Sequence, residues 1–265
     1  MNPETINELW SVAREAADAA RGAILPHFRA DTLTADNKDQ TGGFDPVTIA
    51  DQAGEDAIRE VLAARRPLDG IIGEERGRQD AASEFTWILD PIDGTRAFLA
   101  GAPTWGTLIA VWQGTRPILG MIDQPYIGER FEGGCGQAKL EHCGQMRDLK
   151  CRDVSDLSDA ILTSTFPEIG TDEERQSFEQ VRDRAKLVRY GLDCYGYALV
   201  AAGQVDLVIE AGLNIYDIAA PIAVVEAAGG VVTNWQGGPV GEGGQVIATG
   251  SARLHRQAIE VLNSR

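Results

Sequence analysis

The sequence lacks the features that mark a membrane or secreted protein. No apolar run reaches the roughly 18 residues that can span a bilayer, and the first residues show no basic segment followed by an apolar one. The four cysteines form no C-x-x-C pair. Three of them recur every eight residues near His142, and we interpret them as reduced thiols rather than as zinc ligands. We therefore expect a cytoplasmic protein with no membrane partner.

Basic residues and histidines are also scarce. The 24 Lys and Arg residues face 40 Asp and Glu residues, and the resulting net charge of -16 argues against nucleic acid as a partner. The same charge suits a protein that gathers carboxylates around metal ions, although a solvated acidic surface gives the same composition. The three histidines lie far apart at positions 27, 142 and 255, so we do not expect a Ser-His-Asp triad or a phosphohistidine.

Strand and helix signals alternate along the 265 residues. Apolar periodicity predicts helices over residues 5–27, 51–66, 95–99, 171–185, 194–202, 218–228 and 252–262. It predicts strands at 71–72, 87–89, 107–112, 117–122, 129–131, 160–165, 187–188, 205–209, 231–233 and 245–249. The polar residues 31–46 read as a loop or hairpin. This alternation predicts an α/β protein of layered sheets and helices.

The Gly-, Cys- and charge-rich region 133–158 has few apolar residues. We interpret it as the link between an N-terminal α+β half (residues 1–145) and a C-terminal α/β half (residues 146–265). A chain of this length forms one large domain or two closely packed ones.

The stretch Trp87–Arg96 is the most informative part of the chain. Three apolar residues run into Asp90-Pro-Ile-Asp-Gly-Thr95, and Pro91 predicts that the strand ends there. Asp93 is a candidate cap for the helix that follows. Two carboxylates around such a turn can converge on one point, where a hard cation such as Mg²⁺ would bind, and the helix N–H groups favour a phosphate beside it. The alternative is a capped turn with two solvated acids.

Three more acids stand at predicted element ends. Asp51 opens a helix after Asp45-Pro-Val-Thr, Glu74 follows the strand at residues 71–72, and Asp217 begins a helix that carries Pro221. Taken one at a time, each acid is explained as well by a structural role.

Together these motifs resemble the signature of the inositol-monophosphatase-like, magnesium-dependent phosphatases. The matching segments are Gly-Glu74-Glu, Asp90-Pro-Ile-Asp-Gly-Thr95, Tyr216-Asp-Ile-Ala-Ala220 and Asp45-Pro-Val-Thr-Ile-Ala-Asp51. The resemblance implies a layered α-β-α-β-α sandwich, a homodimer and about two or three Mg²⁺ ions per active site. It implies as metal ligands Glu74, Asp90, the carbonyl of Ile92, Asp93 and Asp217. It also implies that Asp51 and Thr95 act with Glu74 in catalysis and orient the attacking water.

The substrate is suggested by departures from the inositol phosphatase pattern. Arg96, residues 101–110, 120–126 and 129–131, and Tyr190-Gly-Leu-Asp-Cys-Tyr-Gly-Tyr197 resemble histidinol-phosphate phosphatases of this family. Histidinol phosphate carries an ammonium group and an imidazole, whereas inositol is neutral. Asp193 and Glu210 would supply negative charge that discriminates against a neutral ligand. The alternative for Asp193 is a helix cap, and Arg96 and Arg189 either steer the phosphate or pair with these acids.

We therefore expect a Mg²⁺-dependent phosphatase that hydrolyses L-histidinol phosphate in histidine biosynthesis. The substrate-binding residues implied are Ile92, Asp93, Gly94, Thr95, Arg96, Arg189, Asp193, Glu210 and Asp217. An inositol-1-phosphatase or a broader sugar-phosphate phosphatase is the alternative within the same class. An inactive relative that binds a phosphate ligand as a regulator is the alternative from a different class.

Overall fold

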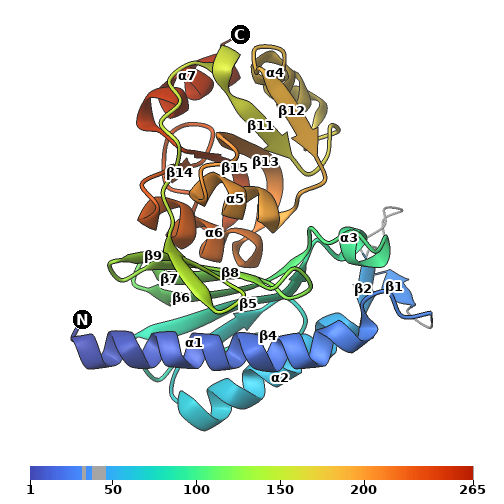
Figure 1. The fold of residues 1–265 in the computed structure, drawn as a ribbon, viewed down its shortest axis with the longest axis vertical. Helices are drawn as coiled ribbons and strands as arrows, with labels where there is room; N and C mark the ends of the chain where they lie inside the picture. The colour runs from blue at the N-terminus through green and yellow to red at the C-terminus, as the bar shows by residue number, and fades with distance from the viewer. Residues whose placement is uncertain (32–33, 38–45, 265) are drawn as a thin grey trace.

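Helices and sheets alternate in layers in the computed structural model, which describes residues 1–31, 34–37 and 46–264 (Figure 1). A pair of helices covers an eight-stranded sheet, a second pair separates it from a five-stranded sheet, and a third pair covers the far side. This order confirms the α-β-α-β-α sandwich. In the described part of the chain, no helix is long and apolar enough to cross a membrane.

The first helical layer consists of α1 (Pro3–Ile24) and α2 (Ile49–Arg65). Between them, η1 (Leu25–His27) ends the first helix, and β1 (Ala35–Asn37) pairs with β2 (Pro46–Thr48). The predicted hairpin is therefore confirmed in its paired strands, whereas its residues 38–45, including Asp45, lie outside the described residues. The buried faces of α1 and α2 share one apolar core with the sheet beneath them.

The eight-stranded sheet has the order β10-β9-β8-β7-β6-β5-β3-β4. Its strands are β3 (Gly70–Gly73), β4 (Gly77–Gln79), β5 (Phe85–Asp93), β6 (Gly106–Gln113), β7 (Arg116–Gln124), β8 (Glu129–Gly134), β9 (Gln137–His142) and β10 (Gln145–Asp148). Within the predicted link at residues 133–158, β9 and β10 extend the sheet, and residues 149–156 connect it to the elements of the smaller sheet. The proposed division after residue 145 falls inside β10, and the two halves stay a prediction.

The five-stranded sheet has the order β12-β11-β13-β15-β14. Its strands are β11 (Ile161–Ser164), β12 (Leu187–Tyr190), β13 (Leu207–Asn214), β14 (Val231–Thr233) and β15 (Gly243–Thr249). η2 (Leu157–Asp159) precedes it, and α4 (Asp172–Arg182) and α7 (Ala252–Leu262) cover its outer face.

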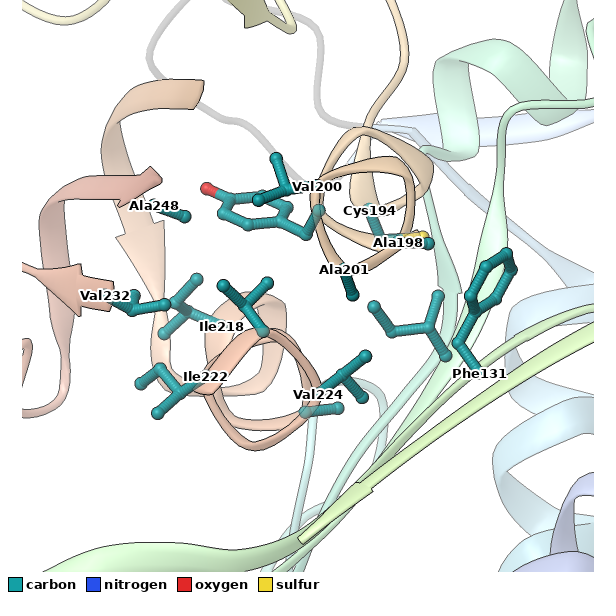
Figure 2. Packing of buried hydrophobic residues seen from close by; sticks show 14 of the residues in the cluster. Phe131, Cys194, Ala198, Val200, Ala201, Ile218, Ile222, Val224, Val232 and Ala248 are labelled. Atoms are coloured by element: carbon teal, nitrogen blue, oxygen red, sulfur yellow. The ribbon is translucent and has the colours of Figure 1, made fainter. Parts of the chain in front are cut away.

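The middle helices α5 (Cys194–Ala201) and α6 (Ile215–Ala227) pack between the two sheets. Figure 2 shows residues of α6 between Val232 and Ala248 of one sheet and Phe131 of the other. The approach to the larger sheet is close, because a Cβ added to Gly133 would lie 2.3 Å from the Cα of Val224. Small residues on the sheet therefore determine how near α6 can pack.

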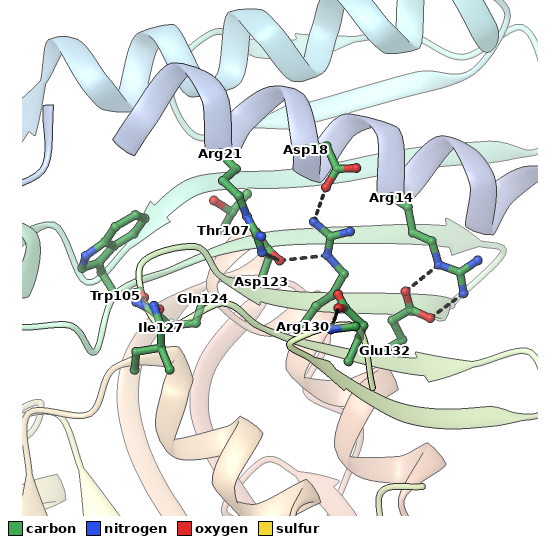
Figure 3. A network of polar contacts seen from close by, with 12 residues as sticks. Arg14, Asp18, Arg21, Trp105, Thr107, Asp123, Gln124, Ile127, Arg130 and Glu132 are labelled. Atoms are coloured by element: carbon green, nitrogen blue, oxygen red, sulfur yellow. Dashed lines mark hydrogen bonds and ion pairs between the residues drawn. The ribbon is translucent and has the colours of Figure 1, made fainter. Parts of the chain in front are cut away.

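On the face of the eight-stranded sheet opposite α6, ion pairs connect the sheet to α1 (Figure 3). Asp123 is fully buried and accepts hydrogen bonds from Arg21 on α1 and from Arg130 on β8, both at 2.8 Å. Arg14 donates to both carboxylate oxygens of Glu132. Buried acids with such partners resist separation, because breaking a pair leaves an uncompensated charge.

Replacing Gly133 by alanine should destabilise the protein, because the new methyl group would overlap the backbone of α6. We expect the free energy of unfolding in urea to fall by about 1–3 kcal/mol. Gly22→Ala is the control, since no atom lies within 4 Å of a Cβ there and helix propensity alone should add about 0.5–1 kcal/mol. Equal stability of the two variants would contradict this packing.

Candidate active site

The end of β5 carries the first two acids. The strand continues to Asp93, and its pairing with β6 shifts register between Asp90 and Asp93. The prediction that Pro91 ends the strand was therefore wrong, because a β-bulge accommodates a residue that cannot donate to the ladder. Asp90 is buried and accepts a hydrogen bond from the amide of Ile92 at 3.0 Å. The bulge thus places the carboxylates of Asp90 and Asp93 at an irregular end of the strand.

The helix α3 (Thr95–Leu99) follows with the predicted bounds, but Asp93 does not cap it. The cap position belongs to Gly94, whose φ of 86° is in the left-handed region. The carboxylate of Asp93 accepts a hydrogen bond of 2.6 Å from the amide of Cys194, at the first residue of α5. Asp93 is therefore oriented by a helix that lies a hundred residues further along the chain.

Asp217 reaches the same place from α6. That helix begins at Ile215, so the prediction that Asp217 begins it was wrong. Asn214 is the cap, and Asp217 in the first turn accepts from the amide of Asn214 at 2.7 Å. Oxygen atoms of Asp90, Asp93 and Asp217 all lie within 4.8 Å of one another. Glu74 lies beside this group, close enough for its charge to act on Asp90.

Burial and mutual repulsion govern the protonation of this acidic cluster. Burial, followed by the neighbouring charges of Glu74, Asp93 and Asp217, raises the pKa of Asp90 well above its usual range. Burial likewise raises the pKa of Asp93, with Asp193 and Asp217 contributing, whereas the hydrogen bond from Cys194 lowers it. Crowded oxygen ligands of this kind fit a hard divalent cation, which would offset their repulsion. All four cysteines are free thiols, and none belongs to this cluster.

Asp51 and Thr95 are brought together beside the cluster. Asp51 lies in the first turn of α2, where one carboxylate oxygen accepts from the amide and hydroxyl of Thr48 at 2.8 and 2.6 Å. Its other oxygen lies 3.3 Å from the hydroxyl of Thr95. The same hydroxyl lies 3.1 Å from the carbonyl of Ile92. A capping acid and a residue of the central motif, 44 positions apart, therefore form one hydrogen-bonded group.

A cavity of about 330 Å³ opens onto this group. Predicted residues in its lining are Glu74, Asp93, Gly94, Thr95, Arg96, Asp193, Glu210 and Asp217. Larger hollows of about 590 and 620 Å³ lie elsewhere, and the cluster of Asp90, Asp93 and Asp217 does not line them. Because the walls come from β5, α3, α6 and the smaller sheet, the cavity depends on the packing of both sheets against the middle helices.

Asp193 and Glu210 add two further acids to the cavity wall, and Asp193 lies close enough to the acidic cluster for its charge to act on Asp93. Asp193 occupies the N-cap position of α5, as the helix-cap alternative predicts, but its side chain makes no capping hydrogen bond. Its φ of 48° is unusual for a residue with a side chain, and its carboxylate lies 3.3 Å from the hydroxyl of Thr104. Glu210 accepts from the amide and hydroxyl of Thr165 at 2.7 and 2.9 Å. Burial raises the pKa of Asp193 to about 6 and that of Glu210 to about 7.

The two predicted arginines differ in position. Arg96 lines the cavity, and its guanidinium lies 5.0 Å from the ring centre of Phe166. Arg189 lies on the edge strand β12, where residues alternate between exposed and half-buried, and it is exposed and absent from the cavity lining. Strand alternation turns Arg189 outward, so the structure does not bring it together with the other predicted site residues, and its role in substrate binding stays a prediction.

Sequence reasoning missed several residues around the cavity, among them Thr165, Phe166 and Thr104. Thr165 and Phe166 line it just beyond the end of β11, and Thr104 contacts Asp193. The position of Thr165 as the last residue of a predicted strand was a usable signal, because strand ends often carry functional groups. Phe166 and Thr104 gave no such signal.

The layered sandwich with its buried carboxylates is the arrangement of a class of metal-dependent phosphatases. The chain belongs to the inositol monophosphatase family, because the sequence model of that family matches residues 6–265. It is therefore a phosphatase of that family. This membership favours the hypothesis of an enzyme over that of an inactive phosphate-binding regulator.

Relatives within this family differ in the substrate that their names state. The chain is 40% identical to a chloroplastic bifunctional phosphatase from Arabidopsis thaliana, over 97% of this chain and 75% of that protein. It is 34% identical to a histidinol-phosphatase from Streptomyces coelicolor, over 99% of both chains. A solved inositol monophosphatase from Zymomonas mobilis superposes with a TM-score of 0.85 and 38% identity over the whole of both chains.

The raised pKa of Glu210 makes a prediction about stability. Its usual value is 4.5, so above that pH the unfolded chain releases a proton that the folded protein keeps up to about pH 7. Stability should fall as the pH rises through this window, by up to roughly 3 kcal/mol. When metal-free protein is unfolded in urea at pH 5 and pH 8, Glu210→Gln should remove the share of the fall that Glu210 contributes, whereas Asp90, Asp93 and Asp193, whose pKa values are also raised, keep theirs. The exposed Glu242→Gln should behave like the wild type; a Glu210→Gln curve parallel to both would contradict the assignment.

Proposed function

We propose that the protein is a Mg²⁺-dependent phosphatase in which Glu74, Asp90, Asp93, Asp217 and the carbonyl of Ile92 hold the metal ions. The proposal rests above all on one observation, the convergence of three carboxylates within 4.8 Å beside a fourth. Oxygen-only donor sets of this kind suit magnesium rather than softer metals. When bound, the ions supply charge stabilisation for the phosphate and for the leaving oxygen.

Asp51 and Thr95 are proposed to orient the attacking water. Asp51 can accept the hydroxyl proton of Thr95, over a distance of 3.3 Å. The hydroxyl oxygen of Thr95 then presents its lone pairs to a water, which it can hold by accepting a hydrogen bond. Glu74 borders the same space and contributes a further acceptor. A nucleophile held in this way needs no covalent enzyme intermediate.

The phosphate is proposed to lie against the turn Ile92–Thr95, next to the metal ligands. Gly94 leaves that surface open, because its conformation and its contact with Asp193 exclude a larger side chain. Arg96 lines the adjoining wall and supplies positive charge. The substrate would thus enter with its phosphate toward β5 and the rest of the molecule toward the smaller sheet.

We propose L-histidinol phosphate as the substrate, and thus a role in histidine biosynthesis. Asp193 and Glu210 line the part of the cavity that would receive the remainder of the substrate, and their charge suits an ammonium group. The likeness to a histidinol-phosphatase over nearly the full chain supports this choice. A neutral polyol would leave these carboxylates without a countercharge.

An inositol phosphate is the second candidate substrate, within the broader class of sugar phosphates. The similarity to the inositol monophosphatase from Zymomonas mobilis favours it. We further propose a cytoplasmic location and a homodimer, and sedimentation velocity on the purified protein would measure the oligomeric state.

Asp193→Ala should separate these two substrates. Loss of the carboxylate removes a countercharge for the ammonium group, so KM for histidinol phosphate should rise about 10-fold or more. KM for inositol phosphate should stay unchanged or fall. Phosphate release measured with Mg²⁺ gives both constants, and Asp153→Ala, at an exposed position, is the matched control. An equal loss on both substrates would contradict the proposed pocket.

Asp93→Asn tests the metal site. The amide keeps an oxygen that can accept from Cys194 but loses the charge that holds a cation, so kcat/KM should fall by more than about 100-fold. Chelation of the wild-type protein should abolish phosphate release, and added Mg²⁺ should restore it. Wild-type activity in Asp93→Asn would overturn the ligand assignment.

A further inference from the structure

Glu55 is a buried acid that none of the proposed chemistry uses. It lies on α2 one helical turn after Asp51, so both side chains project from the same face of the helix. Its exposed fraction is 0%. A carboxylate is rarely enclosed to this degree unless its oxygens are occupied.

The partners of Glu55 are backbone amides of the turn between β3 and β4. One carboxylate oxygen accepts from the amide of Glu75 at 2.7 Å, and the other accepts from the amide of Arg76 at 3.1 Å. Arg59 on the next turn of α2 donates to that second oxygen at 2.7 Å and also to the carbonyl of Gly77. Glu55 and Arg59 therefore hold residues 75–77 from one side.

Gly73, the residue before Glu74, makes room for this contact. A Cβ added to Gly73 would lie 2.1 Å from a carboxylate oxygen of Glu55, closer than real atoms approach. The carboxylate thus rests directly on the backbone at the end of β3. The absence of a side chain at Gly73 and the acid at Glu55 are complementary parts of one contact.

The backbone at Glu74 and at the two residues after it is held by hydrogen bonds from two different elements. The amide of Glu74 donates to the carbonyl of Leu89 on β5 at 3.2 Å, and the next two amides along the chain donate to Glu55. Three successive amides are therefore fixed, one by the central strand and two by α2. Glu74 itself lines the cavity together with Asp93 and Asp217.

We propose that Glu55 is a positioning residue that sets the place of Glu74 and so tunes the affinity of the metal site. This inference rests on the proposed role of Glu74 as a metal ligand. Glu55 itself touches neither metal nor substrate, and it acts only through the turn that it holds. Partners of this kind, one step behind a ligand, change metal affinity by about 10–100-fold when altered. With Asp51 holding Thr95, a single helix would then position two sides of the active site.

Glu55→Gln tests the proposal with metal binding as the readout. The new amide nitrogen cannot accept a hydrogen bond, so one backbone amide of the turn loses its partner. We expect the dissociation constant for Mg²⁺, measured by titration calorimetry without substrate, to rise about 10-fold or more. Activity at saturating Mg²⁺ should remain near the wild-type level, because no group at the reacting atoms has changed.

Glu60→Gln on the exposed side of the same helix is the matched control and should keep wild-type affinity. If Glu55→Gln does not fold, Gly73→Ala displaces the same contact from the other side and should weaken Mg²⁺ binding as well. A lower melting temperature with an unchanged Mg²⁺ dissociation constant, in whichever variant folds, would overturn the positioning role. Wild-type protein that binds no Mg²⁺ would instead overturn the metal-site proposal on which it rests.

Discussion

Repulsion between carboxylates at the end of β5 is the constraint on which the rest of the site depends. Asp90, Asp93, Asp217 and Glu74 meet at one place from three different elements. Burial raises the pKa values of Asp90 and Asp93, so the charged cluster is unfavourable without a cation. A scaffold must therefore hold each acid in place before any ion binds.

That scaffold consists largely of backbone amides. Asp90 accepts from Ile92 within its own bulge, Asp93 accepts from the first amide of α5, and Asp217 accepts from the residue that caps α6. Each of these three acids is thus held by at least one backbone amide. Preorganisation of this kind keeps ligands in place at little entropic cost on binding.

The middle helices connect this chemistry to the packing of the whole molecule. α6 packs against glycines of the larger sheet while its first turn presents Asp217, and α5 begins at the amide that orients Asp93. The residue before α5, Asp193, lies in the cavity wall. The same short segment thus touches both the acidic cluster and the region proposed for the substrate, so recognition and metal binding share one support.

The sequence by itself determined the layered α/β fold, the bounds of α3 and α7, and most of the acids that meet at the site, because these depend on local periodicity and on local motifs. It could not reveal β9 and β10, since these short strands carry few apolar residues and pair at the edge of a sheet. Only the tertiary structure decided that Arg189 faces outward, that Thr165 holds Glu210, and that Glu55 supports the turn of Glu74. Those contacts join residues 20 or more positions apart, and packing of whole elements, rather than local pattern, brings such residues together.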